Sequence, residues 1–301
     1  PKIVQNIHQQ GGTILGSSRG PQEVPEMVDT LEQMNVGMLF TIGGDGTLRG
    51  AQEIAEEIER RKLKIAVIGV PKTIDNDISY VQQSFGFVTA VSEATKAIYS
   101  AHAEASGARN GIGLVKLMGR HAGFIAAYAT LANSDVNFCL VPEVDFTLES
   151  FLKALQERLS KRGHAVVVAA EGAGQDLFGT TGARDASGNI RLVDIGIFLK
   201  DRITAHFQEQ GIETNLKYID PSYIIRSVPA TPSDSAFSLM LGHNAVHAGM
   251  AGRTSMVVGY WKNEFSHVPI SATVSKGKRM DPRDKLWTGV LSSTGQPREM
   301  R

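Results

Sequence analysis

Short apolar runs alternate with amphipathic segments along most of the chain. The apolar runs predict buried strands at residues 38–42, 65–70, 111–117, 137–141, 165–170 and 255–261. Between them, apolar residues recur every three or four positions and predict helices at 48–63, 88–101, 121–133, 148–162, 195–210 and 234–250. This alternation predicts an α/β fold in which mostly parallel sheets are flanked by helices. The polar segment 217–227 is expected to be extended. Residues 271–284 are expected to form a solvated connection, with nucleic-acid contact as a minor alternative.

The composition narrows the class of protein. A chain of 301 residues buries a large core and is expected to form two domains. Thirty-one basic and 31 acidic residues give zero net charge, so local arginines and lysines must attract any anionic substrate. The one cysteine, Cys139, excludes an internal disulfide and is expected to be a buried thiol in a reducing cytosol. No apolar run approaches the ~20 residues of a membrane helix, and the start does not resemble a signal peptide. We therefore expect a cytoplasmic protein that binds neither nucleic acid nor a membrane.

Two glycine-rich acidic segments each follow an apolar run: GGDGT at 43–47 and PKTIDND at 71–77. In an open parallel sheet, ligands bind at the carboxyl ends of the strands. Glycines let backbone amides approach phosphate oxygens, and carboxylates hold Mg²⁺ or take a proton from a hydroxyl. Adjacent strand ends would bring together the residues that carry this chemistry, which are Gly44, Asp45, Gly46, Thr73, Asp75 and Asp77. The pair of segments predicts a phosphoryl-transfer site.

Each segment has a simpler interpretation as well. A plain strand-to-helix turn would explain Gly43 and Gly46 but not Asp45. The last glycine comes one residue too late for the dinucleotide fingerprint GxGxxG, and the P-loop pattern GxxxxGK[ST] is absent. An extended PKTIDND would present its threonine and both aspartates on one face, whereas a solvated turn is the alternative.

Three further places carry candidate chemistry. Met118-Gly119-Arg120 follows a strand and opens a predicted helix, whose free amides and adjacent arginine would bind an anion. Glu171 ends a strand, where a carboxylate accepts sugar hydroxyls or caps the next turn. Lys217, Tyr223 and Arg226 share one short segment, a spacing equally typical of a solvated strand. None of the eight histidines has a partner at metal-ligand spacing, so we interpret them as structural or surface residues.

With these motifs in place, the chain resembles the 6-phosphofructokinases over nearly its whole length. GGDGT, PKTIDND, LMGR, Glu171 and KYIDPSYIIR occur in that family's order and close to its spacings. GGDGT is shared with NAD and diacylglycerol kinases, but TIDND together with MGR is highly specific. Lys72 and the YIIR form are similar to the branch that contains plant and trypanosome ATP-dependent enzymes and the pyrophosphate-dependent enzymes. Members begin with a further strand and a glycine-rich loop, and this chain starts after both, so the resemblance implies a fragment.

The resemblance implies two Rossmann-like three-layer α/β domains with the active site in the cleft between them. Residues 1–88 with about 228–275 would form the nucleotide-binding domain. Residues 89–227 with about 276–301 would form the sugar-phosphate-binding domain. It also implies a homodimer or homotetramer in which sites are shared across subunits.

The activity that the resemblance implies is ATP-dependent phosphorylation of fructose 6-phosphate in glycolysis, with Asp75 as general base and Mg²⁺ on Asp45. The implied catalytic residues are Asp75, Thr73, Asp77, Arg120 and Lys72. Those near ATP are Arg19, Gly44, Asp45, Gly46, Thr47 and Gly50. Those near fructose 6-phosphate are Thr73, Ile74, Asp75, Met118, Gly119, Arg120, Glu171, Lys217, Tyr223, Ile224, Ile225 and Arg226.

Two residues bear on the phosphoryl donor. Gly46 leaves room for the α-phosphate of ATP where pyrophosphate users carry an aspartate, whereas Lys72 is shared with pyrophosphate users. The glycine acts by steric exclusion and a flexible lysine can swing aside, so ATP is favoured. The alternatives are a pyrophosphate-dependent enzyme, a non-catalytic regulatory subunit of the same fold and, more remotely, a Rossmann oxidoreductase. Gly111 stands where bacterial ATP enzymes carry an arginine, so control by their effectors is not implied.

Overall fold

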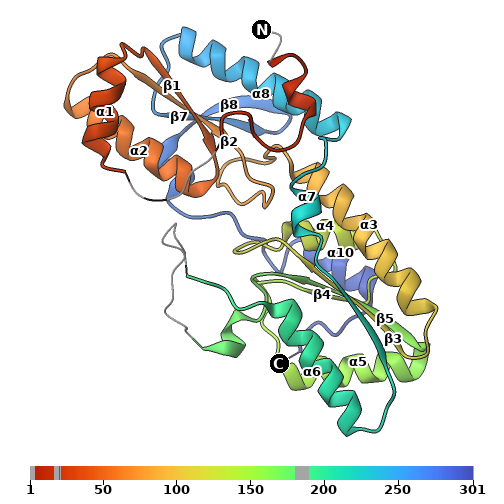
Figure 1. Cartoon of the computed structure of the whole chain (residues 1–301). Helices are drawn as coiled ribbons and strands as arrows, with labels where there is room; N and C mark the ends of the chain where they lie inside the picture. The colour runs from red at the N-terminus through yellow and green to blue at the C-terminus, as the bar shows by residue number, and fades with distance from the viewer. Residues whose placement is uncertain (1–3, 17–19, 21, 180–189, 301) are drawn as a thin grey trace. The chain divides into compact units, whose positions relative to one another are not determined.

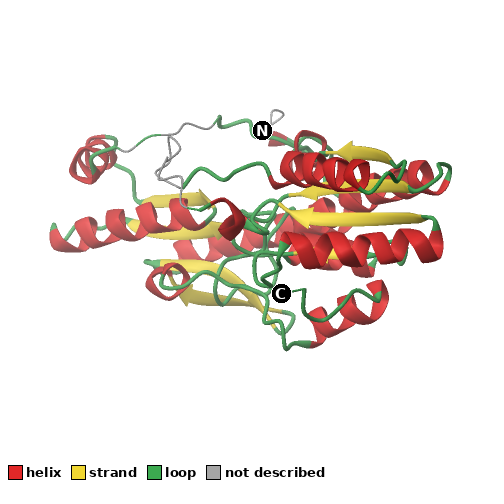
Figure 2. Cartoon of the chain, turned by 90° about the horizontal axis from the view of Figure 1, so that it is seen from below, coloured by secondary structure: helices red, strands yellow, loops and turns green. Residues whose placement is uncertain are grey.

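The chain divides into two compact units in the computed structural model, which describes residues 4–16, 20, 22–179 and 190–300. One unit is formed by Pro1–Val88 with Val228–Lys278, and the other by Thr89–Ser227 with Arg279–Arg301. Among the described residues, each unit contains one four-stranded sheet with helices packed against it (Figures 1 and 2). The predicted α/β class with mostly parallel sheets is confirmed.

The sheet of the first unit has the strand order β1-β2-β7-β8. The first three strands are parallel, and the fourth runs antiparallel to β7; their bounds are β1 Met38–Gly43, β2 Ala66–Pro71, β7 Met256–Trp261 and β8 Glu264–Pro269. Successive side chains of a strand point to opposite faces, so β2 contributes to two cores. Val67 packs with apolar residues of the helices α1, α2 and α9, whereas Ile68 packs against α8. These helices span Val24–Gln33 (α1), Asp45–Arg60 (α2), Ile270–Val274 (α9) and Pro232–Met250 (α8), and a short 3-10 helix, η2, spans Ile7–Gln9.

The sheet of the second unit is wholly parallel, in the order β4-β5-β3-β6. Its strands are β3 Gly111–Leu117, β4 Phe138–Leu140, β5 His164–Ala170 and β6 Asn215–Ile219. Helices α5 and α6 cover one face, α3, α4 and α10 belong to the other layer, and a 3-10 helix η3 follows β5. Their bounds are α3 Phe87–Ser106, α4 Phe124–Leu131, α5 Leu148–Arg162, η3 Gln175–Phe178, α6 Ile195–Glu209 and α10 Lys285–Thr294.

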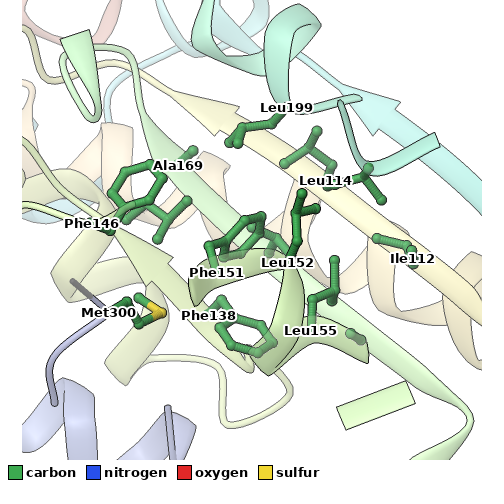
Figure 3. Packing of buried hydrophobic residues seen from close by; sticks show 14 of the residues in the cluster. Ile112, Leu114, Phe138, Phe146, Phe151, Leu152, Leu155, Ala169, Leu199 and Met300 are labelled. Atoms are coloured by element: carbon green, nitrogen blue, oxygen red, sulfur yellow. The ribbon is translucent and has the colours of Figure 1, made fainter. Parts of the chain in front are cut away.

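A core of the second unit lies between its sheet and helices α5 and α6 (Figure 3). Ile112 and Leu114 of β3 face this core and are fully buried. Phe151 of α5 is also fully buried and meets the ring of Phe138 nearly edge-on, with ring centroids 5.6 Å apart. Such aromatic pairs add to the burial of apolar area, which is the main stabilising contribution here.

The opposite face of β3 explains why its sequence alternates glycine with apolar residues. A Cβ on Gly111 would lie 2.0 Å from the carbonyl oxygen of Ala105, and one on Gly113 would lie 2.6 Å from that of Ala101. Helix α3 therefore lies directly on the backbone of β3. Only glycine permits this close approach, so the two glycines serve the packing of α3 on β3.

Two predicted helix starts are wrong by three residues, in opposite directions. Helix α2 begins at Asp45 rather than Leu48, so the acidic end of GGDGT lies inside its first turn. Helix α4 begins at Phe124 rather than His121, because the residues before it form a separate turn. Segment 217–227 is extended only as far as Ile219 and then forms the short helix α7, Ser222–Ile225.

The C-terminal third contains elements that the sequence pattern did not predict. Strand β7 is not the last strand, because Lys262 and Asn263, both at positive φ, make a two-residue turn into β8. Residues 271–284 are not simply a solvated connection, since Thr273 and Met280 are buried. Within the described part of the chain, no helix combines the length and apolarity needed to cross a lipid bilayer.

Candidate functional site

The ends of β1 and β2 place the two glycine-rich acidic segments next to each other. The strands pair in register up to Gly43 and Pro71, and the Lys72 amide donates to the Gly43 carbonyl at 2.8 Å. A Cβ on Gly44 would lie 3.8 Å from Cβ of Thr73. GGDGT and PKTIDND therefore form one continuous edge of the first unit.

The first turn of α2 supplies backbone amides at this edge. Gly44 is the N-cap residue and makes no side-chain capping bond, so Asp45, Gly46 and Thr47 carry the unpaired amides of a helix start. No atom lies within 4 Å of where a Cβ on Gly46 would stand. The positive end of the helix dipole and open space beside Gly46 suit an anion such as a phosphate.

The residues around this turn differ in their contacts and exposure. The Thr47 side chain lies so close to Gly43 that a Cβ there would be 2.1 Å from Thr47 Oγ1, which explains that glycine. Asp45 forms an ion pair with Arg49 one turn later and keeps about a third of its side chain, 36%, exposed. Gly50 faces open space.

The described residues contain no cluster of three or more His, Cys, Asp or Glu able to hold a metal ion. Magnesium takes many of its ligands from phosphate and water, so a single accessible carboxylate fits it.

PKTIDND forms a turn, and the expectation of an extended segment with three side chains on one face is wrong. Thr73 Oγ1 accepts a hydrogen bond from the Asp75 amide at 3.2 Å and donates to Asp77 Oδ1 at 3.1 Å. Asn76 between the aspartates has φ 54°, in the left-handed region. The chain reverses there, and this reversal brings Thr73 to both aspartates.

A buried polar network, missed by the sequence analysis, holds this turn in shape. Asn76 is buried, donates to the Gln82 carbonyl at 3.1 Å and accepts from the Ser84 amide at 3.0 Å. The fully buried Ser84 hydroxyl donates to the Thr73 carbonyl at 2.5 Å. The signal was present, because asparagine is among the few residues that adopt positive φ readily.

Lys278 is a second residue that the sequence analysis missed, because it lies in the predicted solvated connection. Its ammonium donates to the Val81 carbonyl at 2.7 Å, and its backbone amide donates to the Asp77 carbonyl at 2.7 Å. Burial lowers the pKa of Lys278 to about 8, although the nearby Asp77 acts in the opposite direction. Lys278 therefore supports both ends of the 77–81 segment.

In the second unit, the turn after β3 is joined to the end of β5. The Glu171 amide donates to the Leu117 carbonyl at 2.8 Å, and the Gly172 amide donates to the Gly119 carbonyl at 3.1 Å. Gly119 has φ 124°, and a Cβ there would lie 2.6 Å from the Ala122 carbonyl oxygen. The Met118-Gly119-Arg120 turn and Glu171 thus form one rigid edge.

Two arginines and a carboxylate meet at this edge. Arg226 Nε donates to Met118 Sδ at 3.1 Å, which brings the end of segment 217–227 against the turn. Burial raises the pKa of Glu171, and the charges of Arg226 and Arg120 oppose that rise. Arg120 Nε is buried and has no hydrogen-bond partner among the described residues. The group has unused donors for an anionic or hydroxyl-rich ligand.

At the helix start beside this turn, one amide of the predicted anion site is already bonded to a carboxylate of the chain. The amide of Gly123, the N-cap of α4, donates to both carboxylate oxygens of Glu143, at 3.0 and 3.1 Å. The Met280 amide also donates to Glu143, at 3.0 Å. The predicted anion site therefore lacks the Gly123 amide, and its remaining contributors, the arginine side chains among them, stay a prediction.

The remaining predicted site residues make fewer contacts with the two strand-end edges described above. Lys217 is exposed on β6 and pairs with Gly113, four residues before the end of β3, or ~13 Å along the strand. Tyr223 and Ile224 of α7 are exposed, whereas Ile225 is buried. In the first unit, Lys72 is exposed, and Ile74 packs beside Gly86, whose Cβ would lie 3.1 Å from it. Arg19 lies outside the described residues.

Comparison with known proteins identifies the family. A sequence model named PFK: Phosphofructokinase matches residues 1–249. The chain belongs to the phosphofructokinase family. It is 53% identical to the ATP-dependent 6-phosphofructokinase of Borreliella burgdorferi, over 100% of this chain and 70% of that protein. It is 47% identical to the ATP-dependent 6-phosphofructokinase 5, chloroplastic, of Arabidopsis thaliana, over 98% of this chain and 56% of that protein. The predicted family is thereby confirmed.

Solved structures support the fold. The chain is similar to the pyrophosphate-dependent phosphofructokinase of Marinobacter aquaeolei, with a TM-score of 0.77 and 21% identity, over 98% of this chain and 77% of that one. At this identity the similarity concerns the fold alone. The chain spans between about half and about two thirds of the length of the phosphofructokinase relatives from Borreliella and Arabidopsis.

Replacing Lys278 with Met should remove a pH-dependent contribution to stability. The folded pKa of about 8 lies below the ordinary 10.5, so between these values the folded protein binds fewer protons than the unfolded chain. Wild-type stability is therefore lowest below pH 8 and rises as pH increases through 8, by about 1 kcal/mol between pH 7 and pH 9. Urea unfolding at both pH values measures this rise. It should be absent from Lys278→Met and present in the exposed control Lys276→Met, and equal pH dependence in both variants would contradict the assignment.

Proposed function

We propose that the protein transfers the γ-phosphoryl group of ATP to the 1-hydroxyl of fructose 6-phosphate, giving ADP and fructose 1,6-bisphosphate. The observation that carries this proposal is the joint edge of β1 and β2, where the open first turn of α2 lies beside the Thr73–Asp77 turn. The names of the Borreliella and Arabidopsis relatives, both ATP-dependent 6-phosphofructokinases, support the choice of reaction.

The donor phosphates bind at the start of α2. The amides of Gly44, Gly46 and Thr47 contact the phosphate oxygens, and Gly50 and Arg19 are assigned to the nucleotide through the family resemblance. Asp45, which is paired with Arg49 and partly exposed, would hold Mg²⁺. When bound, the metal neutralises charge on the donor phosphates, which is the main electrostatic requirement of phosphoryl transfer.

Asp75 acts as the general base that removes the proton from the sugar 1-hydroxyl. Thr73 and Asp77 flank it, and their mutual hydrogen bond fixes the orientation of the turn. Lys72 and Arg120 supply positive charge to the phosphoryl group during its transfer. A positioned base contributes ~10²- to 10⁴-fold to rate, and alignment and charge neutralisation supply the rest.

The first unit is the nucleotide-binding domain and the second the sugar-phosphate-binding domain. In the second, Glu171 accepts sugar hydroxyls, and Arg120 and Arg226 bind the 6-phosphate with Tyr223. Met118 and Gly119 shape the floor of this site, and Ile74, Ile224 and Ile225 contribute contacts. Lys217, which stands apart from the edge, would act on the site of a neighbouring subunit in a cytoplasmic homodimer or homotetramer.

The donor is ATP rather than pyrophosphate because of the open space at Gly46. An aspartate side chain there would project into the open space at the start of α2, which we assign to the α-phosphate of ATP. Lys72, the residue shared with pyrophosphate users, is exposed and free to swing aside.

Replacing Asp75 with Asn should lower kcat by ~10²- to 10⁴-fold, because the amide cannot accept the hydroxyl proton. The KM for fructose 6-phosphate should change little, since the amide keeps the shape of the side chain. Steady-state kinetics with a coupled assay measure both. Asp201→Asn, an exposed position on α6, is the matched control and should behave as wild type. A kcat within a few fold of wild type in Asp75→Asn would remove Asp75 from the role of base.

Replacing Gly46 with Asp should raise the KM for ATP by at least ~10-fold, because a carboxylate close to the phosphates costs more than 1.4 kcal/mol. The KM for fructose 6-phosphate should stay unchanged. Gly46→Ala is the matched control, since a methyl group fits the open space without charge. If the aspartate variant used ATP as well as the alanine variant, the steric account of donor choice would be wrong.

A further inference from the structure

A lysine stands at a core position of the second unit. Ile112 and Leu114 point from β3 into the core formed with α5 and α6, and Lys116 is the next residue on that face. Its ammonium lies 2.7 Å from Asp194 Oδ2 and 2.8 Å from Asp220 Oδ2, and only 12% of its side chain is exposed. One mostly covered cation thus joins two carboxylates from segments distant in sequence.

Each carboxylate divides its oxygens between this lysine and a helix start. Asp194 is the N-cap of α6, and its Oδ1 accepts from the amides of Gly196 at 3.0 Å and Ile197 at 3.1 Å. Asp220 Oδ1 accepts from the Ser222 amide, the first residue of α7, at 3.1 Å. Lys116 therefore fixes where α6 and α7 begin relative to the end of β3.

The same three groups border the candidate sugar-phosphate edge. Lys116 comes two residues before Met118, which accepts the hydrogen bond from Arg226 at the end of α7. The charges of Lys116 and Asp220 both act on the carboxyl group of Glu171. Two hydrogen-bonded carboxylates hold the pKa of Lys116 above its ordinary value, so the amine stays charged.

We propose that Lys116 is a positioning residue for the reaction: through Asp220 it sets the orientation of α7, and so places Arg226, at the end of that helix, beside Glu171. This inference rests on the proposed function, because that function assigns Arg226 and Glu171 to fructose 6-phosphate. Lys116 itself need not touch the substrate.

Stability alone does not account for a charge at this position. Covering most of an ammonium and part of two carboxylates costs free energy that the ion pairs only partly return, and an apolar residue of similar size is often as stable or more so. An apolar residue would complete the row begun by Ile112 and Leu114. It would leave Asp220 without the contact that ties α7 to β3.

The test compares Lys116→Met with Lys161→Met, an exposed lysine of α5 in the same unit. In Lys116→Met, the KM for fructose 6-phosphate should rise about tenfold, which corresponds to 1.4 kcal/mol, while the KM for ATP stays within about twofold of wild type. Lys161→Met should change neither constant. Lys116→Arg keeps the charge and should restore most of the affinity for the sugar phosphate.

Asp220→Asn provides a second variant with a smaller change in the core. Its effect on the KM for fructose 6-phosphate should resemble that of Lys116→Met, and the double variant should be no worse than Lys116→Met, because both act through one contact. A lowered unfolding midpoint with unchanged KM in these variants would show a purely structural role and overturn the proposal.

Hydrogen exchange at the amides of residues 222–226, measured without substrate, separates this inference from the proposed function. Exchange should become faster in Lys116→Met and stay unchanged in Lys161→Met. Faster exchange together with a wild type that does not phosphorylate fructose 6-phosphate would contradict the proposed function and leave the control of α7 by Lys116 supported. Unchanged exchange would overturn that control.

Discussion

The parallel pairing of β1 with β2 is the constraint on which the candidate donor site depends. Because the strands stay in register to Gly43 and Pro71, the two loops that follow begin at the same level. One loop turns at once into α2 and offers amides, and the other folds back on itself and offers carboxylates. The amides and carboxylates that we propose for phosphate binding and proton removal thus begin side by side because the strands pair in register. Hydrogen bonds of Thr73 and Asn76 then shape the second loop.

In the second unit, side chains as well as strand pairing bring the candidate site residues together. Its parallel strands β3 and β5 bring the Met118–Arg120 turn to Glu171, but the arginine at the end of α7 comes from a segment after β6. Backbone pairing alone does not orient a short helix of this kind. The contact between Lys116 and Asp220 connects that helix to the strand, and we propose that this is the reason for a charge at this position.

The sequence predicted the fold class, the strand positions and the family because these depend on local periodicity and on specific motifs. It did not predict the turn within PKTIDND, since the reversal depends on Asn76 adopting positive φ and on its bonds to residues 82 and 84. Lys278 and Lys116 were missed for a related reason: both look like surface lysines, and only distant carbonyls or carboxylates make their burial possible. Strand β8 was missed because its alternation of polar and apolar residues is typical of a half-exposed edge strand and carries a weak signal.

The family and its ATP-dependent relatives point to phosphoryl transfer from ATP to fructose 6-phosphate as the chemistry of this chain. The most direct measurement is ³¹P NMR of the wild-type protein with fructose 6-phosphate and Mg²⁺, supplied in parallel with ATP or with pyrophosphate. We expect a new resonance from a phosphate on carbon 1 of the sugar, appearing together with ADP in equal amount, and none with pyrophosphate. Product from pyrophosphate but not from ATP, or no product from either donor, would contradict this assignment.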